Sequence, residues 1–234
     1  MESSPPALLI LETSGSSCSV AVCQGAVLAS ETLHEPLQHA ALLAPLAQKI
    51  LEEALGSAKR LNGVAVSSGP GSYTGLRIGL AFAKGLCQAL EIPLILLPSS
   101  AIFRLSLQRQ YPQIQEHPVL IAWSSKKDYL YLTAFSSTGE NLLPEENYPR
   151  ATWPEIWQSL QGTAPWLAGS GASVFGTEFN IPTERWLPKA VPEARDALPL
   201  AMEAWKKQAF ASLHDAEPRY LSGFSPVKSK PRFG

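Results

Sequence analysis

Residues 67–79 read S-S-G-P-G-S-Y-T-G-L-R-I-G, and the expected fold can be worked out from this stretch. Three glycines and one proline fall within seven positions, directly before an apolar helical pattern. Glycine permits positive φ and a close approach to the backbone, and proline stiffens the chain. A helix that begins after such a loop directs its free N–H groups at it, which is typical of an anion site. The alternative is a tight turn between a strand and a helix.

Strand and helix patterns surround this loop in a fixed order. Short apolar runs predict strands, and apolar residues every three or four positions predict helices. The expected elements are strands at 8–11, 19–23 and 27–31, a helix at 38–55 ended by Gly56, a strand at 63–67, a helix at 75–90 and a strand at 94–97. This order is that of the core unit of actin-like ATPases, in which two such units enclose a nucleotide cleft.

The second half of the chain follows a similar order less clearly. It predicts strands at 119–124, 129–135 and 166–168 and helices at 153–160 and 193–211. We therefore expect an α/β actin-like ATPase (ASKHA) fold with two domains, each a mixed sheet with packed helices. The expected boundaries are 1–105 for the domain with the glycine-rich loop and the association helices, and 106–234 for a smaller, more divergent domain. Ser99 and Ser100 are expected to cap a short bridging helix between them.

Composition limits the classes of function. Hydrophobic residues make up 45% of the 234 residues and charged residues 17%, which is typical of a globular protein. The net charge of −1 gives no basic footprint for independent binding of nucleic acid. No apolar run reaches membrane-spanning length, and the start lacks the pattern of a signal peptide. We expect a cytoplasmic protein without membrane contact.

The chain lacks the usual patterns of catalysis. His34 and His39 stand five residues apart with Pro36 between them, so they do not share the helix face that a metal pair requires. The three cysteines have neither metal-ligand spacing nor a disulfide framework. There is no Walker lysine motif and no G-x-S-x-G. Glu12 is the only acid at the end of the first strand, and we expect neither a metal site nor catalytic residues.

The glycine loop, together with L-I-L-E-T-S at 9–14, resembles the TsaB (YeaZ) family. These are accessory proteins in the biosynthesis of threonylcarbamoyladenosine in tRNA and paralogues of TsaD. Further matching stretches are L-L-A-P at 42–45, I-P-L at 92–94, L-A-G-S-G at 167–171 and E-P-R-Y-L at 217–221. The resemblance spans nearly the whole chain and is strongest from residue 8 to residue 100. Glu12 replaces the usual aspartate, and Ser124 and Lys126 lie where the family tends to have an aspartate and an arginine.

The resemblance implies a subunit without catalytic activity that binds, stabilises and activates the catalytic subunit TsaD. It also implies that a TsaE-type ATPase completes the assembly, that the isolated protein forms a homodimer, and that contact with tRNA is only indirect, through the complex. The basic residues 228–232 are read as a solvated terminus, with contact to tRNA phosphates as the alternative. The alternative function is an independent nucleotide-binding hydrolase or a glycopeptidase-like enzyme that uses the interdomain cleft.

The sequence leaves two roles of the glycine loop open. The first role is binding of nucleotide. We expect no required cofactor, but weak binding of ATP or ADP would use hydrogen-bond donors near the loop and in the second half of the chain. The candidates are Thr13, Ser14, Gly69, Gly71, Ser72, Thr74, Gly169 and Gly171.

The second role is association with a partner. Gly75, Gly79 and Ala83 recur at every fourth position and form a stripe of small residues on one helix face. Such a stripe indicates a close approach of another helix, either the 38–55 helix of the same domain or a helix of a second chain. We expect the contact to be intermolecular, with Leu42 and Leu46 on the preceding helix taking part.

Overall fold

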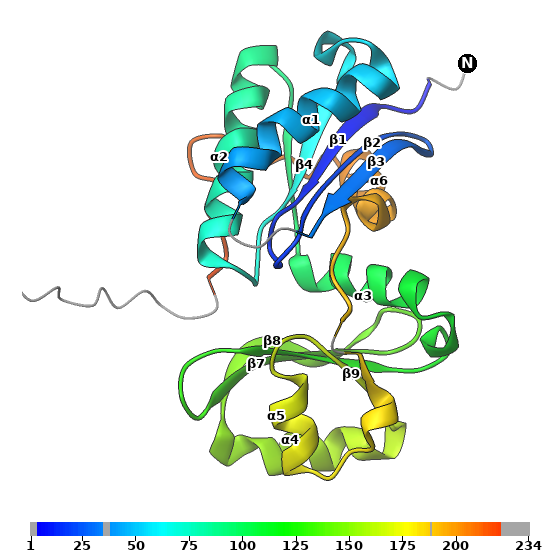
Figure 1. Cartoon of the computed structure of the whole chain (residues 1–234), viewed down its shortest axis with the longest axis vertical. Helices are drawn as coiled ribbons and strands as arrows, with labels where there is room; N and C mark the ends of the chain where they lie inside the picture. The colour runs from blue at the N-terminus through cyan, green and yellow to red at the C-terminus, as the bar shows by residue number, and fades with distance from the viewer. Residues whose placement is uncertain (1–3, 35–37, 188, 221–234) are drawn as a thin grey trace, which may run out of the picture.

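The computed structural model describes residues 4–34, 38–187 and 189–220, and in it two five-stranded mixed sheets lie one above the other (Figure 1). The first sheet has the order β3-β2-β1-β4-β5. Its strands are β1 (Ala7–Glu12), β2 (Cys18–Gln24), β3 (Val27–Leu33), β4 (Gly63–Ser67) and β5 (Leu94–Leu97). The first three strands are antiparallel, whereas β4 and β5 run parallel to β1, so that β1 and β4 end at the same edge of the sheet.

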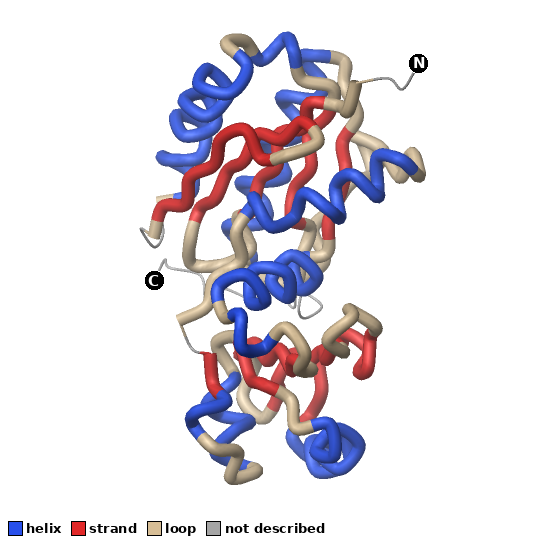
Figure 2. The backbone as a smooth tube through the Cα atoms, turned by 90° about the vertical axis from the view of Figure 1, so that its right-hand side faces the viewer, coloured by secondary structure: helices blue, strands red, loops and turns tan. Residues whose placement is uncertain are grey.

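Helices cover both faces of the first sheet (Figures 1 and 2). On one face α1 (His39–Leu55) and α2 (Tyr73–Leu90) pack on the odd-numbered residues of β1, such as Leu9 and Leu11. On the other face α3 (Ser99–Gln110) and α6 (Leu198–Lys206) pack on Leu8 and Ile10. Alternation along β1 therefore divides its completely buried side chains between two cores.

The second sheet has the order β10-β9-β6-β7-β8. Its strands are β6 (Val119–Ser124), β7 (Tyr129–Phe135), β8 (Asn141–Pro149), β9 (Trp166–Ala168) and β10 (Trp186–Leu187). The helices α4 (Trp153–Leu160) and α5 (Ala172–Glu178) cover one face, with Trp153 and Phe175 buried in the core between them. The other face packs on Phe103 and Leu107 of α3, so α3 lies between the two sheets.

Several predicted elements agree with the structure, and others differ. The strands expected at 63–67, 94–97, 119–124, 129–135 and 166–168 have the expected bounds, and Gly56 ends α1 with φ 71°. The last helix is shorter than expected, because residues 194–197 form a 3-10 turn and α6 ends at Lys206. Strands β8 and β10 and helix α5 are additional to the predicted elements. Ser99 does not cap α3, which begins after Pro98, and its hydroxyl instead accepts a hydrogen bond from the N–H of Gly69 at 3.0 Å.

The division into 1–105 and 106–234 requires correction. Ala194, Ala197 and Ala201 pack on the first sheet, and the N–H of Ala211 donates to the carbonyl of Leu94 in β5 at 2.8 Å. The chain therefore returns from the second sheet to the first. The first domain accordingly consists of the first sheet with α1, α2 and residues 194–220, and the second domain consists of the second sheet with α4 and α5. Within the described residues, no helix has the length and apolar character needed to cross a membrane.

Candidate functional site: the cleft between the domains

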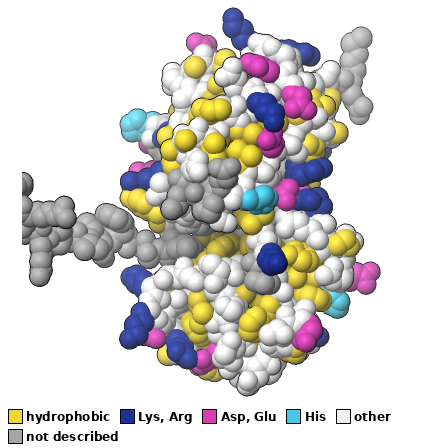
Figure 3. Space-filling view, viewed as in Figure 1, with side chains coloured by type: hydrophobic (Ala, Val, Ile, Leu, Met, Phe, Trp, Pro, Cys, Tyr) yellow, Lys and Arg dark blue, Asp and Glu magenta, His cyan; other side chains and the backbone are white. Residues whose placement is uncertain are grey.

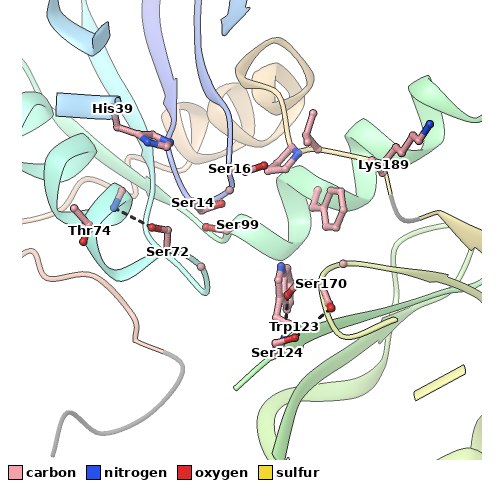
Figure 4. A pocket seen from close by; sticks show the side chains of 18 of the residues that line it. Ser14, Ser16, His39, Ser72, Thr74, Ser99, Trp123, Ser124, Ser170 and Lys189 are labelled. Carbon is pink, nitrogen blue, oxygen red and sulfur yellow. Dashed lines mark hydrogen bonds between the residues drawn. The ribbon is translucent and has the colours of Figure 1, made fainter. Parts of the chain in front are cut away.

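A cleft of about 800 Å³ separates the two domains, and Figure 4 shows it from close by. Ser14, Ser72 and Ser99 face it from the first domain and α3, while Trp123, Ser124 and Ser170 face it from the second domain. Residues 189–192, where the chain returns toward the first domain, complete the wall. The carboxyl ends of β1 and β4 lie beside this cleft, which is the usual position of a ligand in folds with parallel strands.

The glycine loop is held in place by its contacts with two other segments. The N–H of Ser72 donates to the carbonyl of Ser14 at 2.7 Å, and the missing Cβ of Gly71 would stand 2.4 Å from that oxygen. Gly69 has φ 114°, and its missing Cβ would stand 2.2 Å from the carbonyl oxygen of Arg219. Both glycines are required by close approach of the backbone. Ser72 then caps α2, since its hydroxyl accepts a hydrogen bond from the N–H of Gly75 at 3.2 Å.

The stripe of small residues on α2 faces the interior of the first domain. A Cβ at Gly75 would stand 2.1 Å from the carbonyl oxygen of Thr13, and a Cβ at Gly79 would stand 2.2 Å from the hydroxyl of Thr13. Ala83 is completely buried in the core beneath α1 and α2. The prediction that these three residues form an intermolecular face is therefore wrong, because they pack on the end of β1 and on the core. Helix α1, the alternative partner within the same domain, is not the neighbour that excludes side chains at the two glycines.

The candidate nucleotide-binding residues divide into two groups. Those that line the cleft are Ser14, Gly71, Ser72, Thr74 and Gly169. Thr13 lies buried under α2, Gly69 packs on Arg219, and the N–H of Gly171 donates to the carbonyl of Ala122 at 2.9 Å. The structure therefore brings together five of the eight candidates.

The charge of the cleft is small. Among the described residues that line it, Lys189 is the only lysine or arginine, and none is an aspartate or glutamate. Mg²⁺ is usually held by one or two carboxylates together with the phosphates of the substrate. The described lining supplies hydroxyl and N–H groups for an anion, but no carboxylate for a metal–phosphate complex. No group of three or more His, Cys, Asp or Glu residues that could hold a metal was found in the described part of the chain.

The predicted acid at the end of β1 lies inside the protein. Glu12 is completely buried, and its Oε1 accepts a hydrogen bond from the N–H of Ser14 at 2.6 Å. Its Oε2 has no hydrogen-bond partner among the described residues. Burial raises the pKa of Glu12 to about 7, against the opposing effect of hydrogen bonds from Ser14 and Ser67. Glu12 therefore stabilises the turn between β1 and β2 through its hydrogen bond with Ser14, and it does not line the cleft.

Two aromatic residues of the cleft are absent from the sequence-based candidates. The rings of Phe103 on α3 and Trp123 on β6 lie 6.2 Å apart between their centroids, and both line the cavity. The only feature of the sequence that could have placed either residue in the cleft is the position of Trp123 near the end of a predicted strand. Ser124 is fixed at the same wall, since its N–H and hydroxyl both bond to Ser170. Of the two departures from the family pattern in this region, Ser124 lines the cleft and Lys126 does not.

Of His34 and His39, His39 lines the cleft (Figure 4). His39 is buried at the start of α1, and its Nε2 lies 3.0 Å from the carbonyl oxygen of Ser17. His34 is exposed and precedes α1, so the two rings do not share a helix face.

Charged side chains of both signs are interspersed over the face shown in Figure 3, in agreement with the net charge of −1.

Two mixed sheets with helices on both faces and a cleft between them define an actin-like fold of two domains. The family model for TsaD, the tRNA N6-adenosine threonylcarbamoyltransferase, matches residues 27–150. The chain belongs to the TsaB (YeaZ) family, whose members take part in the biosynthesis of threonylcarbamoyladenosine in tRNA.

Two of the similar proteins are covered over nearly their whole length by this chain. The tRNA threonylcarbamoyladenosine biosynthesis protein TsaB of Escherichia coli K12 is 27% identical over 222 residues, which cover 92% of this chain and 94% of that protein. A solved structure of a Pseudomonas aeruginosa protein with similarity to peptidase YeaZ is 26% identical, with a TM-score of 0.76, and the match covers 93% of this chain and all of that one. A TsaD protein of Salinibacter ruber is 44% identical over 57 residues, 24% of this chain and 17% of that protein.

Proposed function

We propose that this chain is a non-catalytic subunit of the tRNA threonylcarbamoyladenosine machinery that binds and activates a TsaD-type catalytic subunit. The observation that carries the proposal is the composition of the cleft, whose described lining has one lysine and no carboxylate. Mg²⁺-dependent phosphoryl transfer relies on acidic side chains that hold the metal. The histidine of the lining, His39, which is a residue type suited to general acid–base catalysis, has its Nε2 3.0 Å from the backbone carbonyl oxygen of Ser17. The one acid at the end of β1, Glu12, is buried and bonded to the backbone. A protein with this cleft acts through its surface.

The surface proposed for association lies on α1 and α2, at positions other than the glycines. Ile78, Phe82 and Leu86 form a row of bulky residues on α2, each only partly buried on the core beneath. Leu42 of α1 is likewise half-buried, whereas Leu46 is 4% exposed and belongs to the core. A row of partly exposed apolar side chains on a helix supports contact with an apolar partner surface. The proposed occupant is the TsaD-type subunit in the complex, and a second copy of this chain in isolation.

An acidic substitution tests this surface. Phe82→Glu is expected to abolish association with the cognate TsaD-type subunit, because it places a charge on the proposed apolar contact. The matched control is Val174→Glu on α5, an exposed apolar residue in the second domain. Sedimentation would follow both self-association and the complex, circular dichroism would confirm folding, and tRNA modification would be measured with TsaD- and TsaE-type subunits present.

Two results would contradict the proposal. One is a folded Phe82→Glu variant that binds and activates the TsaD-type subunit as the wild type does. The other is steady turnover of an acyl or phosphoryl substrate by the pure protein that Ser72→Ala abolishes, because this would favour the alternative of an independent hydrolase or glycopeptidase-like enzyme.

A further inference from the structure

The C-terminal end of the described chain, residues 211–220, forms a strap along α2 (orange and red beside α2 in Figure 1). The Nζ of Lys84 donates to the carbonyl of Ala216 at 3.0 Å. Two helical turns earlier on α2, the Nε of Arg77 donates to the hydroxyl of Tyr220 at 2.7 Å. The rings of Tyr73 and Tyr220 lie 4.8 Å apart between their centroids. The strap is thus bonded to α2 at two places.

The strap also contacts the glycine loop through the backbone of one residue. The N–H of Arg219 donates to the carbonyl of Ser68 at 2.6 Å. The carbonyl oxygen of Arg219 occupies the space in which a side chain at Gly69 would lie, 2.2 Å from its missing Cβ. The position of Arg219 is therefore set by the loop that forms one wall of the cleft.

The side chain of the same residue reaches the second domain. The Nη1 of Arg219 lies 2.9 Å from Oε2 of Glu145, a residue of β8 whose side chain is only 9% exposed. Burial raises the pKa of Glu145, whereas a hydrogen bond from Ser100 at the start of α3 and the charge of Arg219 both favour its ionised form. An ion pair with one nearly buried partner is screened less by solvent than an exposed pair.

The chain itself crosses between the domains at α3 and again before Ala194. At these crossings Arg109 of α3 forms ion pairs with Glu193 and Asp196, so the two connections are bonded to each other. The pair of Arg219 and Glu145 is a further link, made by side chains, between the glycine loop and β8. It joins the two domains without using the covalent connections.

We propose that Arg219 is a positioning residue that holds the second domain against the glycine loop and so sets the width of the cleft. Because the strap is also bonded to α2, release of Arg219 loosens the outer side of α2 at Arg77 and Lys84. This proposal does not depend on the function proposed above, since it concerns the distance between the domains in the isolated chain.

The test measures that distance directly in the full chain. Cysteines introduced at Gln88 on α2 and Leu142 on β8, both exposed, would carry spin labels, while the three native cysteines are buried. Double electron–electron resonance then gives the distance distribution. Arg219→Met is expected to broaden and shift it, and Arg219→Lys, which keeps the charge, is expected to restore most of the wild-type distribution. Arg150→Met is the matched control, because Arg150 pairs with Glu178 inside the second domain.

A second variant and a second measurement make the test independent of any one substitution. Glu145→Gln removes the same ion pair from the other side with little change in shape, and it is expected to reproduce the effect of Arg219→Met. Hydrogen exchange of α2 amides near Arg77 is expected to rise several-fold in Arg219→Met and to stay unchanged in Arg150→Met. A wild-type distance distribution in both Arg219→Met and Glu145→Gln would overturn the proposal. A lower melting temperature without a change in distance would assign Arg219 a role in stability alone and would overturn it equally.

Discussion

The hydroxyl of Thr13 lies 2.2 Å from the point at which a Cβ of Gly79 would stand. Both residues are buried, Thr13 directly after β1 and Gly79 on the face of α2 that packs against it. The Thr13 hydroxyl has no hydrogen-bond partner among the described residues. Van der Waals contact with the glycine therefore sets the distance between α2 and the first sheet, beside the glycine loop.

Gly79→Ala is expected to destabilise the protein by about 1–3 kcal/mol, because it overpacks this contact. The same helix offers a matched control, since a Cβ at Gly85 would meet nothing within 4 Å. Gly85→Ala is expected to raise stability by about 0.5–1 kcal/mol through helix propensity. Unfolding in urea measures both changes. A Gly79→Ala variant that gains stability as Gly85→Ala does would refute the tight contact with Thr13.

Glu12 is expected to make stability depend on pH in one direction. Its folded pKa of about 7 lies above the ordinary value of 4.5, so the folded state binds a proton more tightly than the unfolded state. The contribution of Glu12 to the free energy of unfolding therefore decreases as pH rises from about 4.5 to about 7, by a few kcal/mol at most. Above this range the contribution levels off.

Comparison with Glu12→Gln isolates this contribution, because the other titrating groups are common to both proteins. The difference in unfolding free energy between wild type and variant should change in favour of the variant from about pH 5 to about pH 7. Urea unfolding at several pH values measures it. A difference that is constant over this range would show that Glu12 keeps its ordinary pKa in the folded protein.

Binding of ATP or ADP to the isolated protein is expected to be weak and insensitive to Mg²⁺. The described lining of the cleft offers Ser72, Thr74 and Lys189 to phosphate groups but no carboxylate to the metal. We expect weaker binding of ATP and ADP in the double variant Ser72→Ala/Thr74→Val. The single variant Lys189→Gln should weaken nucleotide binding as well. Lys127→Gln, on the exposed turn between β6 and β7, is the control. Titration calorimetry with and without Mg²⁺ measures this, and tight Mg²⁺-dependent binding would contradict the proposed lack of catalysis.

The isolated protein is expected to bind tRNA weakly and with a steep dependence on salt. The net charge of −1 supplies little of the counterion release that drives binding to nucleic acids. The basic residues 228–232 lie outside the described part of the chain. Filter binding at several salt concentrations measures the affinity, and submicromolar binding at physiological salt would show that a basic surface had been missed.

The first sheet could be predicted because its signals are local. Apolar runs end at Gly15, Gly25 and Gly56, and each of these glycines lies at a turn or a helix end. Strand β8 could not be predicted, because Pro144 interrupts a stretch rich in glutamate and asparagine. Its place at the edge of the sheet explains why proline is tolerated there, since an edge strand has free N–H positions.

The candidate site could be predicted only in part for a related reason. The glycine loop is visible in the sequence because its conformation depends on consecutive residues. Glycine is required at position 69 because Arg219 approaches it closely, and at position 79 because Thr13 does. Each of these neighbours is distant in the sequence and makes the contact only in the folded protein. Phe103 and Trp123 meet in the cleft through the packing of α3 between the sheets, which no local pattern indicates.

The return of residues 194–220 to the first sheet has a consequence for synthesis of the chain. A nascent chain on the ribosome makes β1 to β5 early, yet Leu8 and Ile10 receive part of their cover from Ala194, Ala197 and Ala201. Ala216 completes the opposite core, beneath α2. The first domain therefore cannot complete its two cores before residues 194–216 have been synthesised, and until then the face of its sheet that carries Leu8 and Ile10 is covered only in part, by α3.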